Sequence, residues 1–133
     1  MLLLGLLVQA AHADLFVIVN NQNSTAALSA VQIERIFLLK AKRFESGEPA
    51  APVNQDEKSA VRSAFNEKVM GRDEAQLKYY WSRKMFSGGD KPPPVLRSDA
   101  EVVSFVAENA GGIGYLATAP KDERVKVVLH VKN

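Results

Sequence analysis

The sequence predicts a three-layer α/β/α sandwich with a mostly parallel or mixed sheet, and three observations support this prediction. Short apolar runs of strand length alternate with segments whose apolar residues recur at helical spacing. Three of the helical segments begin with capping-box sequences, and turns rich in Gly and Pro separate the elements. The 133 residues are the length of one domain, for which about 100–200 residues is usual.

The first half of the chain contains two strands and two helices. Residues 15–19 form a continuous apolar run, typical of a strand buried on both faces. Ser29 and Gln32 form a capping box, so a helix begins at Ala30. A short strand ends at Val53, and the next helix ends at Gly71, a residue that adopts the left-handed conformation readily. The residues expected to face inward are Ile33, Ile36 and Phe37 in the first helix and Val61, Ala64, Phe65 and Val69 in the second.

The second half repeats this alternation. The pairs Asp73 with Gln76 and Ser98 with Glu101 predict capping boxes at the starts of two helices. Residues 113–116 are a strand candidate, and we interpret the glycines of residues 111–114 as a helix stop and a tight turn. Residues 125–131 predict an edge strand with one wet face. The residues expected to be buried are Leu77, Tyr80 and Trp81, then Val102, Phe105 and Val106, then Val125, Val127, Leu129 and Val131 on one face of the last strand; Tyr79 is expected to be exposed.

Charge and composition exclude several classes of function. The net charge is only +2 and the signs are interspersed, which disfavours a nucleic-acid partner. The absence of Cys excludes disulfides, Cys-based zinc sites and thiol nucleophiles. His130 reads as a solvated strand residue, and no nucleophile elbow, phosphate-binding Gly-rich loop or zinc motif is present. We therefore predict no enzyme activity, no catalytic residue, no metal and no cofactor.

Residues 1–13 are predicted to be a signal peptide, with the domain at residues 14–133. An apolar run at residues 2–8 is followed by Ala11, His12 and Ala13, a small-x-small triplet that signal peptidase recognises. The alternative is a buried N-terminal strand, because a positive n-region is missing. The apolar run is too short to span a membrane, so we expect a periplasmic mature chain without membrane insertion.

Residues 52–62 are the most informative segment for function, because they join a strand end to a helix start. Ser59 and the exposed amides after it would lie at the positive end of the helix dipole, where anions bind. Lys58 and Arg62 would favour an anion, whereas Asp56 and Glu57 would oppose it. Ordinary helix capping by Ser59 is the alternative interpretation.

Several motifs, in order along the chain, resemble the phosphate-binding proteins of ABC transporters. They are Leu28-Ser-x-x-Gln-Ile-x-x-Ile-Phe37, Phe44-x-x-Gly47, Pro52-Val53 with Ser59, Arg62 and Phe65, Leu77-x-x-Tyr-Trp81 with Phe86-x-Gly88, Ser98 before Glu101-Val102, and Asn109-x-Gly-x-Ile-Gly-Tyr115. The resemblance implies a type 2 periplasmic-binding fold, in which two lobes hold the anion between them. The chain resembles one lobe only.

The residues that the family uses for the anion are altered here. Gln55 stands where the family has an Arg, and Ala60 and Val61 replace a Gly-Thr pair after the matching Ser59. Losing the guanidinium removes a bidentate, charge-assisted contact with an oxyanion. Leu39 stands where a Gly often ends the first helix. The resemblance therefore implies a retained scaffold with a weakened anion site.

Two hypotheses for function follow. The first is a non-catalytic binding protein, linked to ABC-type uptake or its sensing, that holds a small oxyanion such as phosphate weakly. We expect its ligand residues to be Asn54, Gln55, Ser59, Ala60, Val61, Arg62 and Ser98, with the Asn20–Asn23 loop on the same edge of the sheet. The second is an interaction or sensory module that has lost ligand binding and docks on a membrane transporter or sensor, or forms a homodimer.

Overall fold

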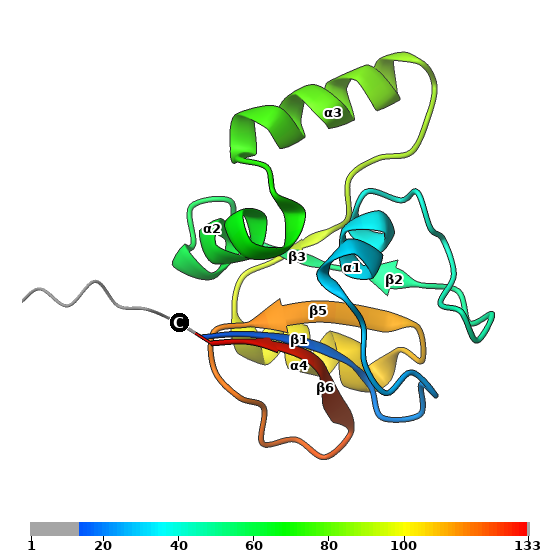
Figure 1. Cartoon of the computed structure of the whole chain (residues 1–133), viewed down its shortest axis with the longest axis vertical. Coiled ribbons are helices and arrows are strands. Elements are labelled where there is room, and N and C mark those ends of the chain that lie inside the picture. Colours follow the sequence, from blue (N-terminus) through cyan, green and yellow to red (C-terminus); the bar gives the residue numbers. More distant parts are fainter. Residues whose placement is uncertain (1–13, 133) are drawn as a thin grey trace, which may run out of the picture.

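The computed structural model describes residues 14–132, so the predicted signal peptide at residues 1–13 lies outside the described residues. The chain alternates between strands and helices in the predicted manner (Figure 1). The elements in order are β1 (Leu15–Asn20), α1 (Ala30–Phe37), β2 (Ala51–Pro52), β3 (Asn54–Gln55), α2 (Ala60–Phe65), the π-helical turn η1 (Asn66–Met70), α3 (Glu74–Phe86), β4 (Val95–Leu96), α4 (Asp99–Glu108), β5 (Gly112–Leu116) and β6 (Val125–Val131).

The main sheet is mixed and lies between two helical layers. Its strand order is β2-β5-β1-β6, with β1 antiparallel to both neighbours and β2 parallel to β5; β3 and β4 form a separate parallel pair. Helices α1 and α2 cover one face and α4 covers the other (Figure 1). The predicted three-layer α/β/α sandwich is confirmed.

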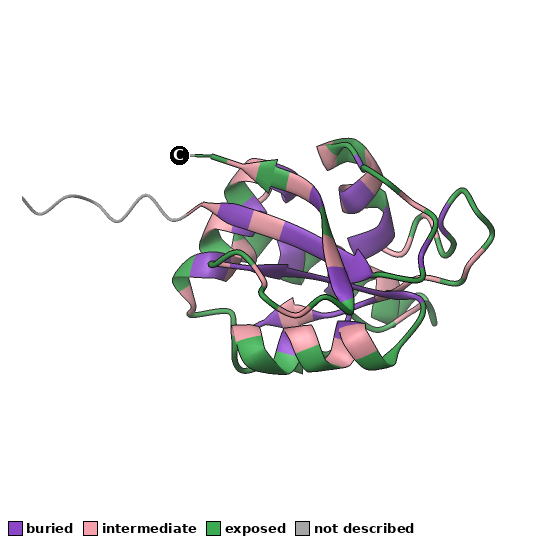
Figure 2. Ribbon diagram, turned by 90° about the horizontal axis from the view of Figure 1, so that it is seen from below, coloured by how far each residue is buried: buried purple, intermediate pink, exposed green. Residues whose placement is uncertain are grey.

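The central strand β1 is largely buried, as predicted (Figure 2), and its side chains alternate between two cores. Leu15, Val17 and Val19 belong to the core under α1 and α2. Ile18 belongs to the smaller core under α4. This alternation is the period-2 geometry of a strand, and it explains why an unbroken apolar run was required in the middle of the sheet.

The last strand departs from the predicted alternation because it contains a bulge. Val17 pairs with Leu129 and Ile18 pairs with Val127, so Val128 is an extra residue in β6. Val128 is buried and Val127 is exposed. The prediction that Val127 lies on the buried face is therefore wrong, although the position of β6 at the edge of the sheet is confirmed.

The helix caps match the sequence at two of the three predicted boxes. Ser29 with Gln32 and Asp73 with Gln76 make both hydrogen bonds of the capping box. Ser98 accepts a hydrogen bond from the Glu101 amide, but the Glu101 carboxylate accepts from the Arg97 amide instead of from the cap residue. The third box is therefore only half formed.

The chain ends two of its helices with residues in the left-handed backbone conformation. Gly71 has φ 62°, which confirms it as a left-handed helix end, and Leu39 has φ 56° at the end of α1, where a Gly would be unstrained. Gly111 allows the chain to pass so close to Pro49 that a Cβ would collide with the Pro49 carbonyl. The glycines near β5 thus serve close packing in addition to the predicted turn.

Helix α3 projects from the body of the lobe (Figure 1). Its buried residues are Leu77 and Trp81, as predicted, whereas Tyr80 is only partly buried and donates a hydrogen bond from its hydroxyl to the Leu38 carbonyl at 2.7 Å. Tyr79 is exposed, in agreement with the sequence prediction. None of the helices within residues 14–132 is both long and apolar enough to cross a membrane.

Candidate functional site

Most of the predicted ligand residues gather at one edge of the sheet, which we call the rim and define as residues 54–62, 98–99 and 117–118. The carboxyl ends of β2 and β5 meet here because the two strands are parallel. The chain then passes through β3 to the start of α2, and β4 leads to the start of α4 beside it. This is the edge where open α/β sheets bind ligands.

The Asn20–Asn23 loop does not belong to this edge, so its predicted place in the site is wrong. Strand β1 runs antiparallel to β5, with Phe16 opposite Leu116 and Val19 opposite Ile113. The carboxyl end of β1 therefore lies at the far edge of the sheet. There, Asn20 donates hydrogen bonds to the Val106 and Ala107 carbonyls of α4 at 2.9 and 3.1 Å.

Tyr115 connects the rim to the core. Its ring stacks on Phe65 with centroids 3.9 Å apart. Its hydroxyl donates to the Asn54 side-chain oxygen at 2.9 Å and accepts from the Gln55 amide at 2.9 Å. Burial is the main cause that raises the pKa of Tyr115 far above its ordinary value, so the hydroxyl keeps its proton and its role as a donor.

Gln55 is turned into the protein. Its side-chain amide donates to the Asp99 carboxylate at 2.8 Å and to the Tyr115 carbonyl at 2.9 Å, which uses both of its hydrogens. Asp99 also accepts from the Ala117 and Thr118 amides at 3.0 and 3.2 Å. Gln55 thus stabilises the rim itself, next to a carboxylate that would repel an anion.

Arg62 is engaged in a partly buried ion pair with Glu74. Its Nε and Nη2 donate to the two oxygens of the Glu74 carboxylate at 2.6 and 3.1 Å, and its Nη1 donates to the Gln55 carbonyl at 2.9 Å. The side chains of Arg62 and Glu74 are 14% and 27% exposed. Glu74 also accepts from the Asn66 side-chain amide at 2.6 Å. The guanidinium therefore already holds a carboxylate in a bidentate contact.

The two serines of the rim act as helix caps. The Ser59 hydroxyl donates to the Asp56 carbonyl at 2.7 Å and accepts from the Arg62 amide at 3.2 Å. The Ser98 hydroxyl accepts from the Glu101 amide at 3.2 Å. These contacts match the capping interpretation of residues 52–62 and leave Ser59 without a hydroxyl hydrogen for a ligand.

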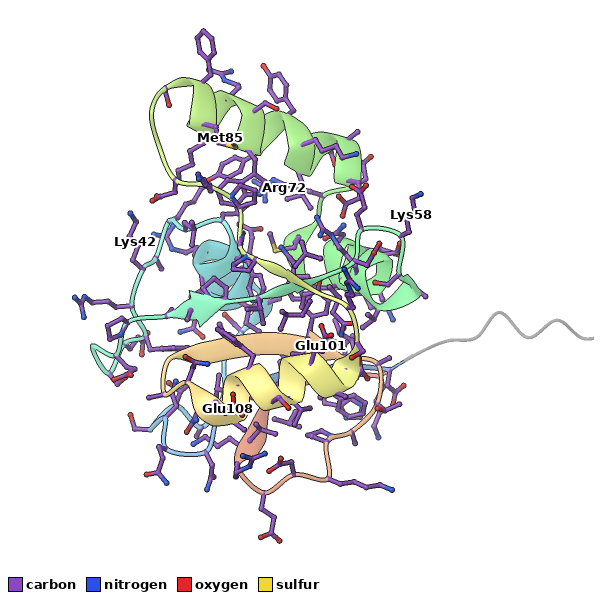
Figure 3. The ribbon with its side chains drawn as sticks, turned by 180° about the vertical axis from the view of Figure 1, so that it is seen from behind. Lys42, Lys58, Arg72, Met85, Glu101 and Glu108 are labelled. Carbon is purple, nitrogen blue, oxygen red and sulfur yellow. The ribbon has the colours of Figure 1, made fainter. Side chains whose placement is uncertain are left out.

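The donors that remain at the start of α2 are backbone amides and one lysine. The Ala60 and Val61 amides have no acceptor among the described residues, as expected for the first turn of a helix. Lys58 points away from the rim into solvent (Figure 3). Asp56 is exposed beside it, and Glu57 pairs with Lys78 at 3.2 Å. The field at the rim is thus mixed in sign.

His130, on the last strand, is engaged by its neighbours. His130 lies 3.0 Å from the Asp14 carboxylate and stacks on Phe16 with centroids 4.3 Å apart. Within residues 14–132, no group of three or more His, Asp or Glu side chains is placed to hold a metal ion.

Comparison with known proteins identifies the fold. No protein-family model matches the sequence, and no curated protein matches it in sequence. Among solved structures, similar chains are a protein from Clostridium perfringens with bound phosphate, assigned as a phosphate ABC transporter substrate-binding protein (TM-score 0.68, 21% identity), an ABC-type phosphate transport receptor from Vibrio cholerae (0.65, 18%) and a protein from Planctomyces limnophilus assigned as phosphate-binding (0.64, 18%). The chain has their fold.

The match covers 87–88% of this chain but only 45%, 46% and 42% of those three chains. The expected type of fold, that of periplasmic binding proteins, is therefore confirmed, and the chain spans less than half of the length of the proteins that it resembles. At this identity the likeness concerns the fold, and the site has to be judged from its own residues.

Sequence reasoning did not single out the three residues that organise the rim: Glu74, Asp99 and Tyr115. Glu74 and Asp99 read as ordinary acidic residues in the first turn of a helix. Tyr115 appeared only as part of a strand motif. Their contacts lie 12, 44 and 60 residues away along the chain, beyond the reach of any local pattern.

A double-mutant cycle tests the strength of the rim ion pair. We expect Arg62→Met and Glu74→Gln to show a coupling free energy of unfolding of about 1.5–3 kcal/mol, because the pair is bidentate and partly buried. The matched control is Lys78 with Glu57, whose side chains are 67% and 44% exposed. For that pair we expect a coupling below about 1 kcal/mol. Equal couplings from urea titrations of the two cycles would contradict a special role for Arg62 and Glu74.

Proposed function

We propose that the chain is an exported, non-catalytic lobe of the phosphate-binding-protein type that acts through a protein partner, a membrane transporter or its sensor, and not through a tight anion site of its own. The observation that carries this proposal is the occupation of Arg62 by Glu74. Export is supported by the apolar run and the small-x-small triplet within residues 1–13.

The energetics of the rim disfavour tight anion binding. A phosphate that uses the Arg62 guanidinium must displace a carboxylate that is tethered in the same chain and already makes two charge-assisted hydrogen bonds. Displacement would also leave Glu74 partly buried without its cation, which is a costly state. Gln55 cannot compensate, because both of its amide hydrogens are used inside the protein.

A partner that covers the rim is part of the proposal. The proteins that the chain resembles are more than twice as long as the matched region, and the resemblance to phosphate-binding proteins implies a second lobe across the anion cleft. A transporter subunit, a sensor or a second copy of the chain could cover the same surface. The lack of a nucleophile and base pair at the rim supports a non-catalytic role.

Calorimetric titration with phosphate tests whether the ion pair of Arg62 with Glu74 prevents tight anion binding. We expect a Kd weaker than about 1 mM for the wild-type chain, which corresponds to about −4 kcal/mol. Glu74→Gln frees the guanidinium while keeping an oxygen for Asn66, so we expect it to tighten phosphate binding at least about fivefold. Glu108→Gln, the same charge change at the far end of α4 (Figure 3), is the control and should leave the affinity unchanged.

A micromolar Kd for phosphate in the wild-type chain would overturn the proposal, since it would show a working anion site. The absence of any gain in Glu74→Gln would show that the carboxylate does not block the site.

A weak oxyanion function is the second candidate, and one observation favours it. The Ala60 and Val61 amides at the start of α2 have no acceptor among the described residues. Backbone amides at a helix start can hold an anion without dedicated side chains. A small oxyanion such as phosphate would there meet Ser59, Ala60 and Val61, with Asn54 and Ser98 at its margin.

Replacing one amide tests this second candidate. Ala60→Pro removes the amide hydrogen at the first helical position, where Pro is well tolerated, and Ser59 has the extended backbone that a following Pro requires. In the Glu74→Gln background, we expect phosphate affinity to fall by about 3–10-fold with little change in melting temperature. Ala30→Pro at the same position of α1, at the opposite edge, is the matched control. Equal affinities in the two Pro variants would exclude the α2 amides as the site.

A further inference from the structure

Helix α3 presents a surface that the fold does not use. It projects from the lobe, and its buried residues are Leu77 and Trp81 (Figure 1). Phe86 is 96% exposed and Tyr79 is 65% exposed. Large exposed aromatic side chains on one element are typical of protein interaction sites.

A groove of about 820 Å³ runs along this helix. Its lining contains three cationic residues, two tyrosines and no acidic residue within the described part of the chain. The lining residues are Arg72, Ala75, Gln76, Tyr79, Tyr80, Arg83, Lys84 and Ser87. Arg72 lies in the space between α3 and the rest of the lobe (Figure 3). The groove, which we call the α3 groove, is thus both cationic and aromatic.

Two of the three cations of the α3 groove, Arg83 and Lys84, are held by neutral groups. Lys84 donates to the Leu38 carbonyl at 3.3 Å and to the Tyr80 hydroxyl at 3.1 Å, and its Nζ lies 5.4 Å from the Tyr80 ring. Arg83 donates to the Tyr79 hydroxyl at 3.3 Å and lies over the Tyr79 ring. Among residues 14–132, neither cation has a carboxylate within 4 Å.

These contacts orient the Arg83 and Lys84 side chains without neutralising their charges. Arg72 pairs with Glu34 at 3.4 Å, which leaves Arg83 and Lys84 as uncompensated charges, and Lys40 adds a third beside Tyr80. Charges that are fixed before binding lose less side-chain entropy when a partner arrives. The contrast with Arg62, whose carboxylate partner is built in, is direct.

We propose that the α3 groove docks an acidic segment of a protein partner, in which carboxylates meet Arg83 and Lys84 and an apolar or aromatic side chain meets Tyr79, with the exposed Phe86 of the same helix available next to the groove. The inference rests on the proposed function, which requires a partner, and adds the place and the chemistry of contact. Complementary charge with central Arg and Tyr contacts is the usual composition of such an interface.

The length of the groove favours a chain segment over a small anion. Its lining extends from Arg72 to Ser87, and α3 alone has 13 residues, which at about 1.5 Å per residue spans about 20 Å. A single phosphate group cannot contact both ends. An extended acidic segment of six or so residues can do so at about 3.3 Å per residue.

The test is a titration with a fluorescent peptide of about ten residues that combines Glu with Phe, using the chain without residues 1–13. We expect saturable binding that falls at least about tenfold in the Arg83→Glu, Lys84→Glu double variant. The matched control reverses the same number of charges at Lys121 and Lys132, which are exposed outside the groove, and should retain most of the binding. A second peptide with Gln in place of Glu should bind at least about tenfold more weakly.

Four other results would contradict the inference, and each has a different meaning. Equal loss in both double variants would show only nonspecific charge attraction. No peptide binding, together with weak phosphate binding by calorimetry, would overturn the α3 groove while the proposed function stands. No peptide binding together with micromolar phosphate binding would overturn both. Binding to phosphatidylglycerol vesicles that depends on Arg83 and Lys84, without peptide binding, would replace the protein partner by a membrane surface.

Discussion

The ion pair between Arg62 and Glu74 is the interaction on which the account of this protein depends. It links the start of α2 to the start of α3 across η1, and it is reinforced by contacts of Arg62 with the Gln55 carbonyl and of Glu74 with Asn66. Because α3 has a narrow buried stripe of Leu77 and Trp81, this pair also contributes to the placement of the projecting helix. The same pair therefore engages the guanidinium of the rim and helps to place α3.

The rim combines the fold of the similar solved structures with polar side chains that bind one another. The sheet and the helix starts that bring donors to one edge are all present, in agreement with the solved structures of similar fold. The side chains at that edge are engaged within the protein, with Gln55 held by Asp99 and Tyr115, and Ser59 used as a cap. Polar groups that satisfy one another in this way rigidify a surface.

Much of the fold could be predicted from the sequence, because helix caps, turn glycines and apolar periodicity are local signals. The starts of α1 and α3 and the left-handed end at Gly71 follow from a few neighbouring residues. The bulge at Val128 could not be predicted, since an extra residue in β6 is defined only by its pairing with β1. The direction of β1, which places the Asn20–Asn23 loop at the far edge of the sheet, could not be predicted either. The same is true of the ion pair between Arg62 and Glu74, two residues that are separated by a π-helical turn.

Glu74 holds the Arg62 guanidinium at the rim, and the state of the Arg62 side chain can be observed directly. In ¹⁵N-labelled protein, the account predicts an Arg62 Nε–H resonance that exchanges slowly with water and does not move up to about 10 mM phosphate, because the Glu74 carboxylate remains in place. A resonance that exchanges fast in the free protein, or that shifts and saturates at micromolar phosphate, would contradict it.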